Sequence, residues 1–248
     1  MTFFLRAYSL LEPGRRERQE DCLYPLPSAS PSQGPLYVLC DGMGGHAAGN
    51  VASQVVCGAL VEKLEARPFS ESLFREAMEA AYDALNREDV QEGTCRTMGT
   101  TLTLACFYWE GCFVAHIGDS RVYHIRPSSR EILFVTRDHS LVNDLVSIGE
   151  LTPEEARVSP QRNILTRAMQ PHQDVRTRAS VTLLTQFQAG DYLFLCSDGI
   201  LEQLDDDALV ELLATPVSEE EKMERLRALT AGNRDNHSAH LVLIEKVQ

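Results

Sequence analysis

Basic clusters and membrane-length apolar runs are both missing from this sequence, and their absence excludes two large classes of partner. Its 23 Lys and Arg residues face 36 Asp and Glu residues, which gives a formal net charge of −13. Nucleic-acid backbones are bound by clustered Lys and Arg, so this balance excludes a nucleic-acid-binding protein. The first ten residues lack a basic leader and indicate a strand rather than a signal peptide. We therefore expect no nucleic-acid partner and no membrane partner.

The cysteines lack the spacing of a metal or redox pair. There are seven, they are scattered, and none forms a Cys-x-x-Cys motif. Such usage is typical of a reducing compartment, and we expect a cytoplasmic protein. No arginine stands six positions after any cysteine, which excludes the Cys-x5-Arg mechanism of cysteine phosphatases. The glycine-rich stretch 44–50 ends in Asn-Val rather than Lys-Ser/Thr, so it is not a nucleotide-binding P-loop.

Short apolar runs rich in β-branched or aromatic residues alternate with helical patterns along the chain. Apolar residues at helical spacing predict two consecutive helices within residues 51–85, and an acidic stretch at 219–224 opens a later helix. A chain of 248 residues that is 44% hydrophobic can bury one sizeable core. The predicted buried strands are 36–40, 101–108, 112–117, 121–125, 132–135 and 192–196. We expect a layered α/β sandwich of packed sheets covered by helices, as a single domain over residues 1–248.

Three aspartates stand at the ends of predicted strands. Asp41 and Asp198 each follow an apolar run and precede a glycine, whereas Asp235 stands just before the apolar run 239–244. If the last strand is antiparallel to the others, the three carboxylates meet at one edge. Converging carboxylates repel one another unless a hard divalent cation binds them, so convergence predicts Mg²⁺ or Mn²⁺. For any one Asp-Gly pair, an ordinary turn remains the alternative.

Taken together and in order, these segments resemble the protein phosphatase 2C (PPM) family, of the bacterial type, over nearly the whole chain. The motifs that carry the resemblance are Arg16 to Asp21, Asp41 to Gly49, Gly99 to Thr101, Gly118 to Arg121, Asp138 to Ser140, Gln161 to Arg167, Ser197 to Gly199, and Asp235-Asn236. The resemblance implies two mainly antiparallel sheets flanked by pairs of helices, an α-β-β-α sandwich, with a mobile flap at about 138–170. It also implies a protein-serine/threonine phosphatase, in which a metal-activated bridging water hydrolyses phosphoserine or phosphothreonine without a covalent intermediate.

The resemblance implies two Mn²⁺ or Mg²⁺ ions that share the bridging water. Their implied ligands are Asp41 as the bridge, Asp198 and Asp235 on one ion, and the Gly42 carbonyl with Glu20 or Asp21, partly through waters, on the other. Asp119 together with Asp198 resembles the ligand pair of a third, weaker metal site. The alternative for Asp119 is a turn aspartate that caps the Gly118 turn.

Two further side chains take roles from the resemblance. Arg16 would hold the substrate phosphate, because a guanidinium matches phosphate oxygens and stays charged. Arg18 is the competing candidate, and an exposed loop arginine is the ordinary interpretation of either. His46 would protonate the leaving oxygen as general acid. Because Met43 occupies the position directly after Asp-Gly, where many relatives outside bacteria carry the acid histidine, His46 could instead order a water.

Partners and alternatives follow from the same resemblance. It implies phosphorylated protein substrates, opposition to a serine/threonine kinase, and a monomer. The flap departs from the family pattern at Ser159 and at Met169-Gln170, which leaves flap-based substrate preference open. The rival functions are a catalytically silent binding domain of the same fold and a metal-dependent hydrolase of small phosphate esters.

Overall fold

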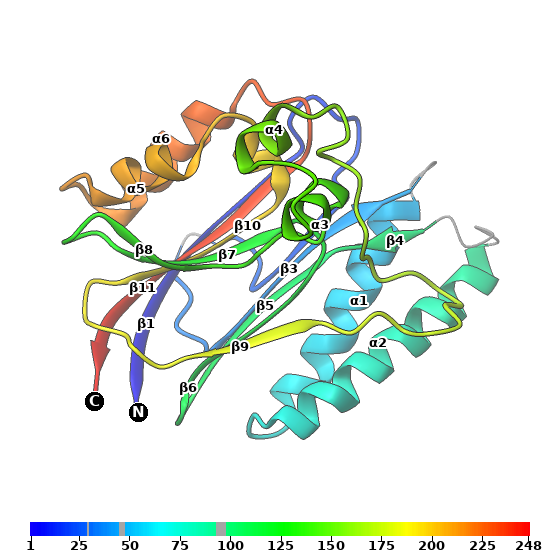
Figure 1. The fold of residues 1–248 in the computed structure, drawn as a ribbon. Helices are drawn as coiled ribbons and strands as arrows, with labels where there is room; N and C mark the ends of the chain where they lie inside the picture. The colour runs from blue at the N-terminus through cyan, green and yellow to red at the C-terminus, as the bar shows by residue number, and fades with distance from the viewer. Residues whose placement is uncertain (29, 45–47, 93–97) are drawn as a thin grey trace.

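Two β-sheets pack face to face in the computed structural model, which describes residues 1–28, 30–44, 48–92 and 98–248 (Figure 1). The first sheet has the order β1 (Phe3–Glu12), β11 (His237–Val247), β10 (Tyr192–Cys196), β7 (Arg121–Arg126) and β8 (Glu131–Val135). The second has the order β2 (Asp21–Tyr24), β3 (Leu36–Met43), β5 (Leu102–Tyr108), β6 (Gly111–Ile117) and β9 (Ser180–Leu184), with the short β4 (Gly99–Thr100) beside β3. All pairings among the described strands are antiparallel.

Helices cover the outer face of each sheet (Figure 1). The second sheet packs against α1 (Ala48–Glu65) and α2 (Glu71–Glu92), and the first packs against α5 (Asp206–Ala214) and α6 (Glu219–Thr230). The predicted α-β-β-α sandwich is therefore confirmed. No described helix is both long enough and apolar enough to cross a bilayer.

The central strands are apolar without interruption because both of their faces are buried. In β10 all five residues are buried. Phe194 and Cys196 point into the core under α5 and α6, whereas Leu193 and Leu195 point into the core between the sheets. A strand of this kind holds its two ends firmly, so whatever follows Cys196 is placed by the sheet.

Residues 138–170 leave the sandwich after β8 and return before β9. They include α3 (Leu141–Ser147) and α4 (Pro153–Val158), where Thr152 and Glu155 form a reciprocal capping box at the start of α4. Arg121 on β7 anchors the start of the segment through a bidentate ion pair with Asp138, at 2.7 Å for both N···O contacts. Neither helix was located by the sequence patterns, because each spans only two turns or fewer.

Candidate metal centre

Asp41 reaches the site on the last residues of β3. The strand continues through Gly42 to Met43, so the Asp-Gly pair is extended strand rather than the ordinary turn that stood as the alternative. Gly42 is required by close packing, because a Cβ there would collide with the carbonyl oxygens of Gly49 and Glu20. The Asp41 backbone is fixed by Thr101, whose hydroxyl accepts from the Asp41 N–H at 3.0 Å and whose N–H donates to the Asp41 carbonyl at 2.8 Å.

Asp198 and Asp235 come from adjacent antiparallel strands, as the sequence analysis required. Asp198 follows β10 and opens a short 3₁₀ helix, η1 (Asp198–Glu202), whereas Asp235 stands two residues before β11 begins. Gly199 lets these two segments touch, because a Cβ there would collide with the Asn236 carbonyl oxygen. The antiparallel register therefore delivers both carboxylates to the same edge of the sheet.

Asn236 fixes the loop that carries Glu20 and Arg16. Its amide nitrogen donates to the carbonyl oxygens of Pro13 and Arg18, both at 2.9 Å, and its amide oxygen accepts from the Glu20 N–H at 2.7 Å. Arg16 on this loop donates to Asp235 Oδ2 at 2.7 Å. One buried side chain thus determines where the N-terminal loop lies against the site.

Asp119 lies in the turn between β6 and β7. Gly118 adopts a positive φ of 103°, a conformation that favours glycine. The Gly118 N–H donates to His139 Nδ1 at 3.1 Å, and the His139 N–H donates to the Gly118 carbonyl at 2.9 Å. His139, at the start of the 138–170 segment, therefore holds the turn that presents Asp119.

These segments close around one cleft of about 270 Å³. Its lining residues are Arg16, Glu20, Asp41, Gly42, Met43, Gly44, Thr101, Asp119, Asn163, Leu165, Asp198 and Asp235. Seven of the nine residues expected at the site are among them. The other two are Asp21 and His46, and His46 lies outside the described residues. Arg18, the competing candidate for the phosphate, does not line the cleft. Asn163 and Leu165 were not singled out, although both belong to the Gln161–Arg167 motif.

Asp21, also expected as a ligand, lies behind the cleft rather than in its lining. Its side chain is buried, and Oδ2 accepts from the hydroxyls of Ser238 at 2.7 Å and Ser197 at 3.0 Å. No group in the described part of the chain forms a hydrogen bond with its Oδ1. Because β2 pairs Asp21 directly with Asp41, the unpaired oxygen belongs to the residue beside the proposed bridging ligand.

The cleft concentrates negative charge that nothing within it neutralises fully. Burial raises the pKa of Asp119 to about 7, and the neighbouring Asp198 adds to the increase. Burial likewise raises the pKa of Asp41 and of Asp198, reinforced by the charges of Asp21 and Asp235 respectively. Asp41 and Asp198 are close enough for each to influence the pKa of the other.

This donor set fits a hard divalent cation. Among the described residues, no group of three or more Asp, Glu, His or Cys side chains is arranged to hold a metal ion as it stands. Asp235 is turned to Arg16, so it would have to leave that ion pair to become a ligand. Oxygen donors that repel one another, together with the unpaired Oδ1 of Asp21, are what a cation with oxygen ligands and bound waters requires.

Comparison with known proteins agrees with this geometry. The family model described as protein phosphatase 2C matches residues 17–231. The chain belongs to the protein phosphatase 2C family. The resemblance inferred from the ordered motifs is therefore confirmed.

Named members of the protein phosphatase 2C family are similar over most of the chain. The serine/threonine protein phosphatase PstP of Mycobacterium tuberculosis is 37% identical over 204 residues, which are 81% of this chain and 38% of that relative. The chain thus spans well under half the length of that relative. The protein phosphatase PhpP of Streptococcus pneumoniae is 35% identical over 214 residues, covering 84% of this chain and 85% of PhpP.

A solved protein phosphatase 2C structure supports the fold and the kind of cofactor. The catalytic domain of serine/threonine protein phosphatase PstP, in complex with two manganese ions, superposes with a TM-score of 0.81. It is 32% identical and covers 99% of this chain and all of that chain. The manganese ions belong to that protein, and they are of the cation class that the carboxylates here fit.

Proposed function

We propose that this chain is a metal-dependent protein-serine/threonine phosphatase that hydrolyses phosphoserine and phosphothreonine in proteins without a covalent enzyme intermediate. The observation that carries the proposal is the convergence of Asp41, Asp119, Asp198 and Asp235 on one cleft beside Arg16. A covalent route would need a nucleophilic side chain in that cleft. Among the described residues the lining contains no cysteine or serine, and Thr101 is committed to the Asp41 backbone and to Ser120. Its carboxylates are the proposed metal ligands, and metal ligation would keep them from acting as nucleophiles.

We propose a role in metal binding for each carboxylate at the cleft. Asp41 would bridge the two metal ions, and Asp198 and Asp235 would bind one of them directly. The Gly42 carbonyl and Glu20 would complete the coordination of the other ion. Asp21 acts through a water from behind, and Asp119 serves a third ion. Two bound Mn²⁺ or Mg²⁺ ions would supply charge neutralisation and a nucleophilic water at neutral pH.

Arg16 positions the phosphate in this proposal. Its guanidinium lies at the cleft and already binds one oxyanion, the Asp235 carboxylate, at 2.7 Å. A phosphate offers anionic oxygens that match the guanidinium, so Arg16 can exchange one anion for the other when Asp235 turns to a metal ion. His46 remains our candidate for the proton donor to the leaving oxygen.

We further propose a monomeric, single-domain enzyme over residues 1–248, with residues 138–170 as its flap, acting in the cytoplasm on proteins phosphorylated by a serine/threonine kinase. The six described cysteines are free thiols, which suits a reducing compartment. The relatives' names, serine/threonine protein phosphatases, support the substrate class. Light scattering after size-exclusion chromatography tests the monomer directly.

Phosphate release from a phosphothreonine peptide tests the function. We expect Mn²⁺-dependent release that EDTA abolishes, and on the order of a 10³-fold lower kcat/KM for Asp198→Ala, because one ligand of the reacting centre is lost. Asp207→Ala is the matched control, since Asp207 is an exposed aspartate in the first turn of α5 and outside the cleft. Activity that survives chelation contradicts the proposal, and absence of activity with either metal favours the silent binding domain.

Selectivity separates the remaining rival. A hydrolase of small phosphate esters would turn over p-nitrophenyl phosphate with a kcat/KM at least as high as that for a phosphothreonine peptide. We expect the peptide to be the better substrate, because only a peptide reaches the protein surface around the cleft.

A further inference from the structure

Several arginines that adjoin cleft-lining residues in the sequence have no carboxylate partner. Ten described arginines form ion pairs with carboxylates; they are Arg6, Arg16, Arg67, Arg75, Arg121, Arg126, Arg130, Arg176, Arg225 and Arg227. Nine others form none within the described part of the chain. Four of the nine, Arg87, Arg137, Arg157 and Arg178, are more than two positions from any cleft-lining residue. The other five, which we call the rim arginines, are Arg15, Arg18, Arg162, Arg167 and Arg234.

Every rim arginine is close in sequence to a residue that lines the cleft. Arg15 and Arg18 flank Arg16 within two positions, and Arg234 directly precedes Asp235. On the flap, Arg162 directly precedes Asn163, and Arg167 follows Leu165 by two positions. All five are exposed. The fold therefore gathers, from three distant segments, a basic rim that no single stretch of sequence displays.

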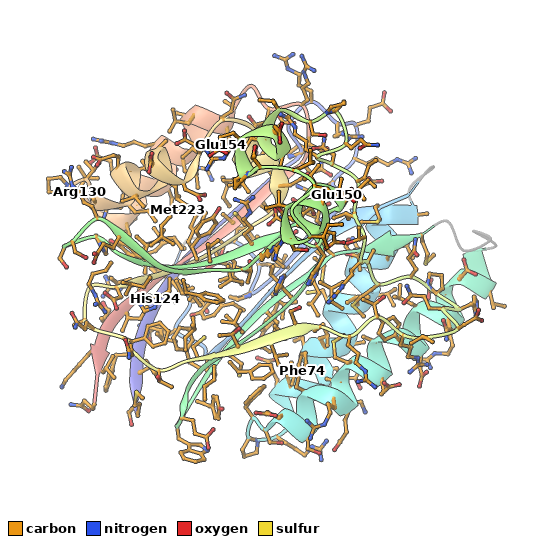
Figure 2. All side chains as sticks on the ribbon, in the orientation of Figure 1. Phe74, His124, Arg130, Glu150, Glu154 and Met223 are labelled. Atoms are coloured by element: carbon orange, nitrogen blue, oxygen red, sulfur yellow. The ribbon has the colours of Figure 1, made fainter. Side chains whose placement is uncertain are left out.

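The flap sorts its charges toward the cleft. Residues 141–155 contain four acidic residues, Asp144, Glu150, Glu154 and Glu155, and no Lys or Arg. Residues 156–173 contain three arginines and no Asp or Glu. Figure 2 labels Glu150 and Glu154 on the acidic half, around α3 and α4. The basic half is the one that contributes Asn163 and Leu165 to the cleft.

The rim arginines have no carboxylate partner although the chain as a whole carries a charge of −13. Ten of the nineteen described arginines pair with a carboxylate, and none of the rim arginines is among them. The Arg167 side chain contacts His139 Nε2 at 3.5 Å instead of an acid. Glu17 lies in the 13–20 loop between Arg15 and Arg18. It is exposed, and it forms no ion pair with any of the rim arginines. A local positive field around an acidic cleft attracts anions that the rest of the protein repels.

We infer that the segments dephosphorylated at this site carry acidic residues flanking the phosphorylated Ser or Thr, and that the rim arginines bind those residues; the inference rests on the proposed function. The phosphate itself occupies Arg16 and the proposed metal ions, which leaves the rim free for Asp and Glu side chains. Guanidinium groups suit this task, because they bind carboxylates bidentately and stay charged. Each exposed pair is worth about a 1.4- to 5-fold gain in affinity, and several act together.

Two phosphothreonine peptides with the same core test the inference. One carries Asp and Glu on both sides of the phosphothreonine, and the other carries Asn and Gln at the same positions. With Mn²⁺ and low salt, we expect kcat/KM to be about tenfold or more higher for the acidic peptide, mainly through a lower KM. The preference should shrink toward unity near 1 M salt, where the screening length falls to about 3 Å.

Variants connect the preference to the rim. Arg162→Gln, Arg167→Gln and Arg234→Gln together should bring the acidic-to-neutral ratio close to one, with thermal melting as the check on folding. Arg130→Gln is the matched control, since Arg130 pairs with Glu211 and is labelled beyond β8 in Figure 2. That variant should keep the ratio of the unmodified protein.

The outcomes separate this inference from the proposed function. Equal turnover of both peptides at low salt, or a preference that persists in the triple variant, overturns the inference and leaves the phosphatase assignment intact. Failure to hydrolyse both peptides and p-nitrophenyl phosphate with Mn²⁺ overturns the proposed function itself.

Discussion

Two groups of carboxylates lie toward opposite ends of the β7–β10 strand pair, one buried at Asp191 and one half-buried in the cleft, and their surroundings shift their pKa values in opposite directions. At one end, each carboxylate oxygen of Asp191 accepts a hydrogen bond from the Arg126 guanidinium at 2.8 Å. Its Oδ2 also accepts one from His124 Nε2 at 2.9 Å. Burial alone would raise the pKa of Asp191, but these hydrogen bonds outweigh it and hold the pKa below its ordinary value. At the other end Asp41, Asp119 and Asp198 have raised pKa values.

The difference shows which end is built for stability and which for binding. The Asp191 group is complete within the chain, since Gln188 also donates its N–H to the carboxylate at 2.9 Å. Among the described residues, the cleft carboxylates have Arg16 as the cation in their lining, and its guanidinium forms an ion pair with Asp235 alone. Because the chain neutralises Asp191 fully, the lack of such partners at the cleft carboxylates indicates that a bound cation neutralises them.

The largest expected effect is the loss of activity when a cleft carboxylate is replaced. Asp198→Asn should lower kcat/KM by on the order of 10³-fold, because a neutral amide is a poor ligand for a hard cation. The same change should leave the metal-free protein as stable as before or more stable, since it removes one of several repelling charges. Steady-state kinetics and urea denaturation in EDTA measure the two effects. A large loss of stability in EDTA would contradict the account.

The corresponding substitution in the Asp191 group should affect stability instead of activity. Asp191→Asn should destabilise the protein by about 3–5 kcal/mol, because it leaves the Arg126 charge partly uncompensated next to a buried histidine. Urea denaturation measures it, with the exposed Asp207→Asn as control, expected within about 0.5 kcal/mol of the unmodified protein. An unchanged unfolding midpoint would show that the ion pair contributes nothing.

The contribution of Asp191 to stability should depend on pH. The folded-state pKa of Asp191 is lowered, so its contribution to stability is fully present above the unfolded pKa of about 3.9 and is lost as the pH falls through the folded value. The stability difference between the unmodified protein and Asp191→Asn should therefore be constant near neutral pH and shrink below about pH 4. A difference that stays constant at every acid pH would argue against the charge as its cause.

A smaller effect tests how the cleft is supported. Asn236→Ala removes three hydrogen bonds that hold the 13–20 loop, so we expect about a 10- to 100-fold loss in kcat/KM with the metal ligands intact. Asn236→Asp keeps the acceptor to the Glu20 N–H and should recover part of the activity. Equal activity of both variants with the unmodified protein would mean that Arg16 and Glu20 do not depend on this clamp.

The smallest effect concerns the turn that carries Asp119. His139 stacks on His116 at a ring-centroid distance of 4.5 Å and accepts from the Gly118 N–H. His139→Phe retains an aromatic ring but loses the acceptor, so it should cost about 1–3 kcal/mol, the penalty for an unsatisfied buried donor. Thermal unfolding measures the loss, and His139→Asn, which keeps an acceptor, provides the comparison.

Sequence order predicted the site better than local pattern predicted its geometry. Asp41, Asp198 and Asp235 were placed at strand ends by apolar runs, and antiparallel pairing brought them together. The alternative of a turn at Gly42 is not what the structure has, because the glycine serves close packing with Gly49, a contact between segments that no local pattern reveals. Asp21 was expected to serve the second ion partly through waters, and it lies behind the cleft, where two distant hydroxyls donate to its Oδ2.

Features assembled from distant segments could not be predicted from the chain. The sequence contains no basic run, yet the rim arginines adjoin residues that line one cleft, because the 13–20 loop, residues 138–170 and the start of β11 contribute to the same lining. The edge strand β9 was missed for a related reason. Three of its five residues are exposed, so the apolar run that marked the central strands is weak there. His46, outside the described residues, stays a prediction.

Calorimetric titration of Mn²⁺ into the metal-free protein tests the central claim, that the cleft carboxylates are completed by a cation. We predict saturable binding by the unmodified protein, with a rise in melting temperature that corresponds to about 2.7 kcal/mol at a hundred times the dissociation constant. Asp191→Asn should retain this binding and Asp198→Asn should lose most of it. Equal Mn²⁺ binding by Asp198→Asn and the unmodified protein, or no binding by either, would contradict the account.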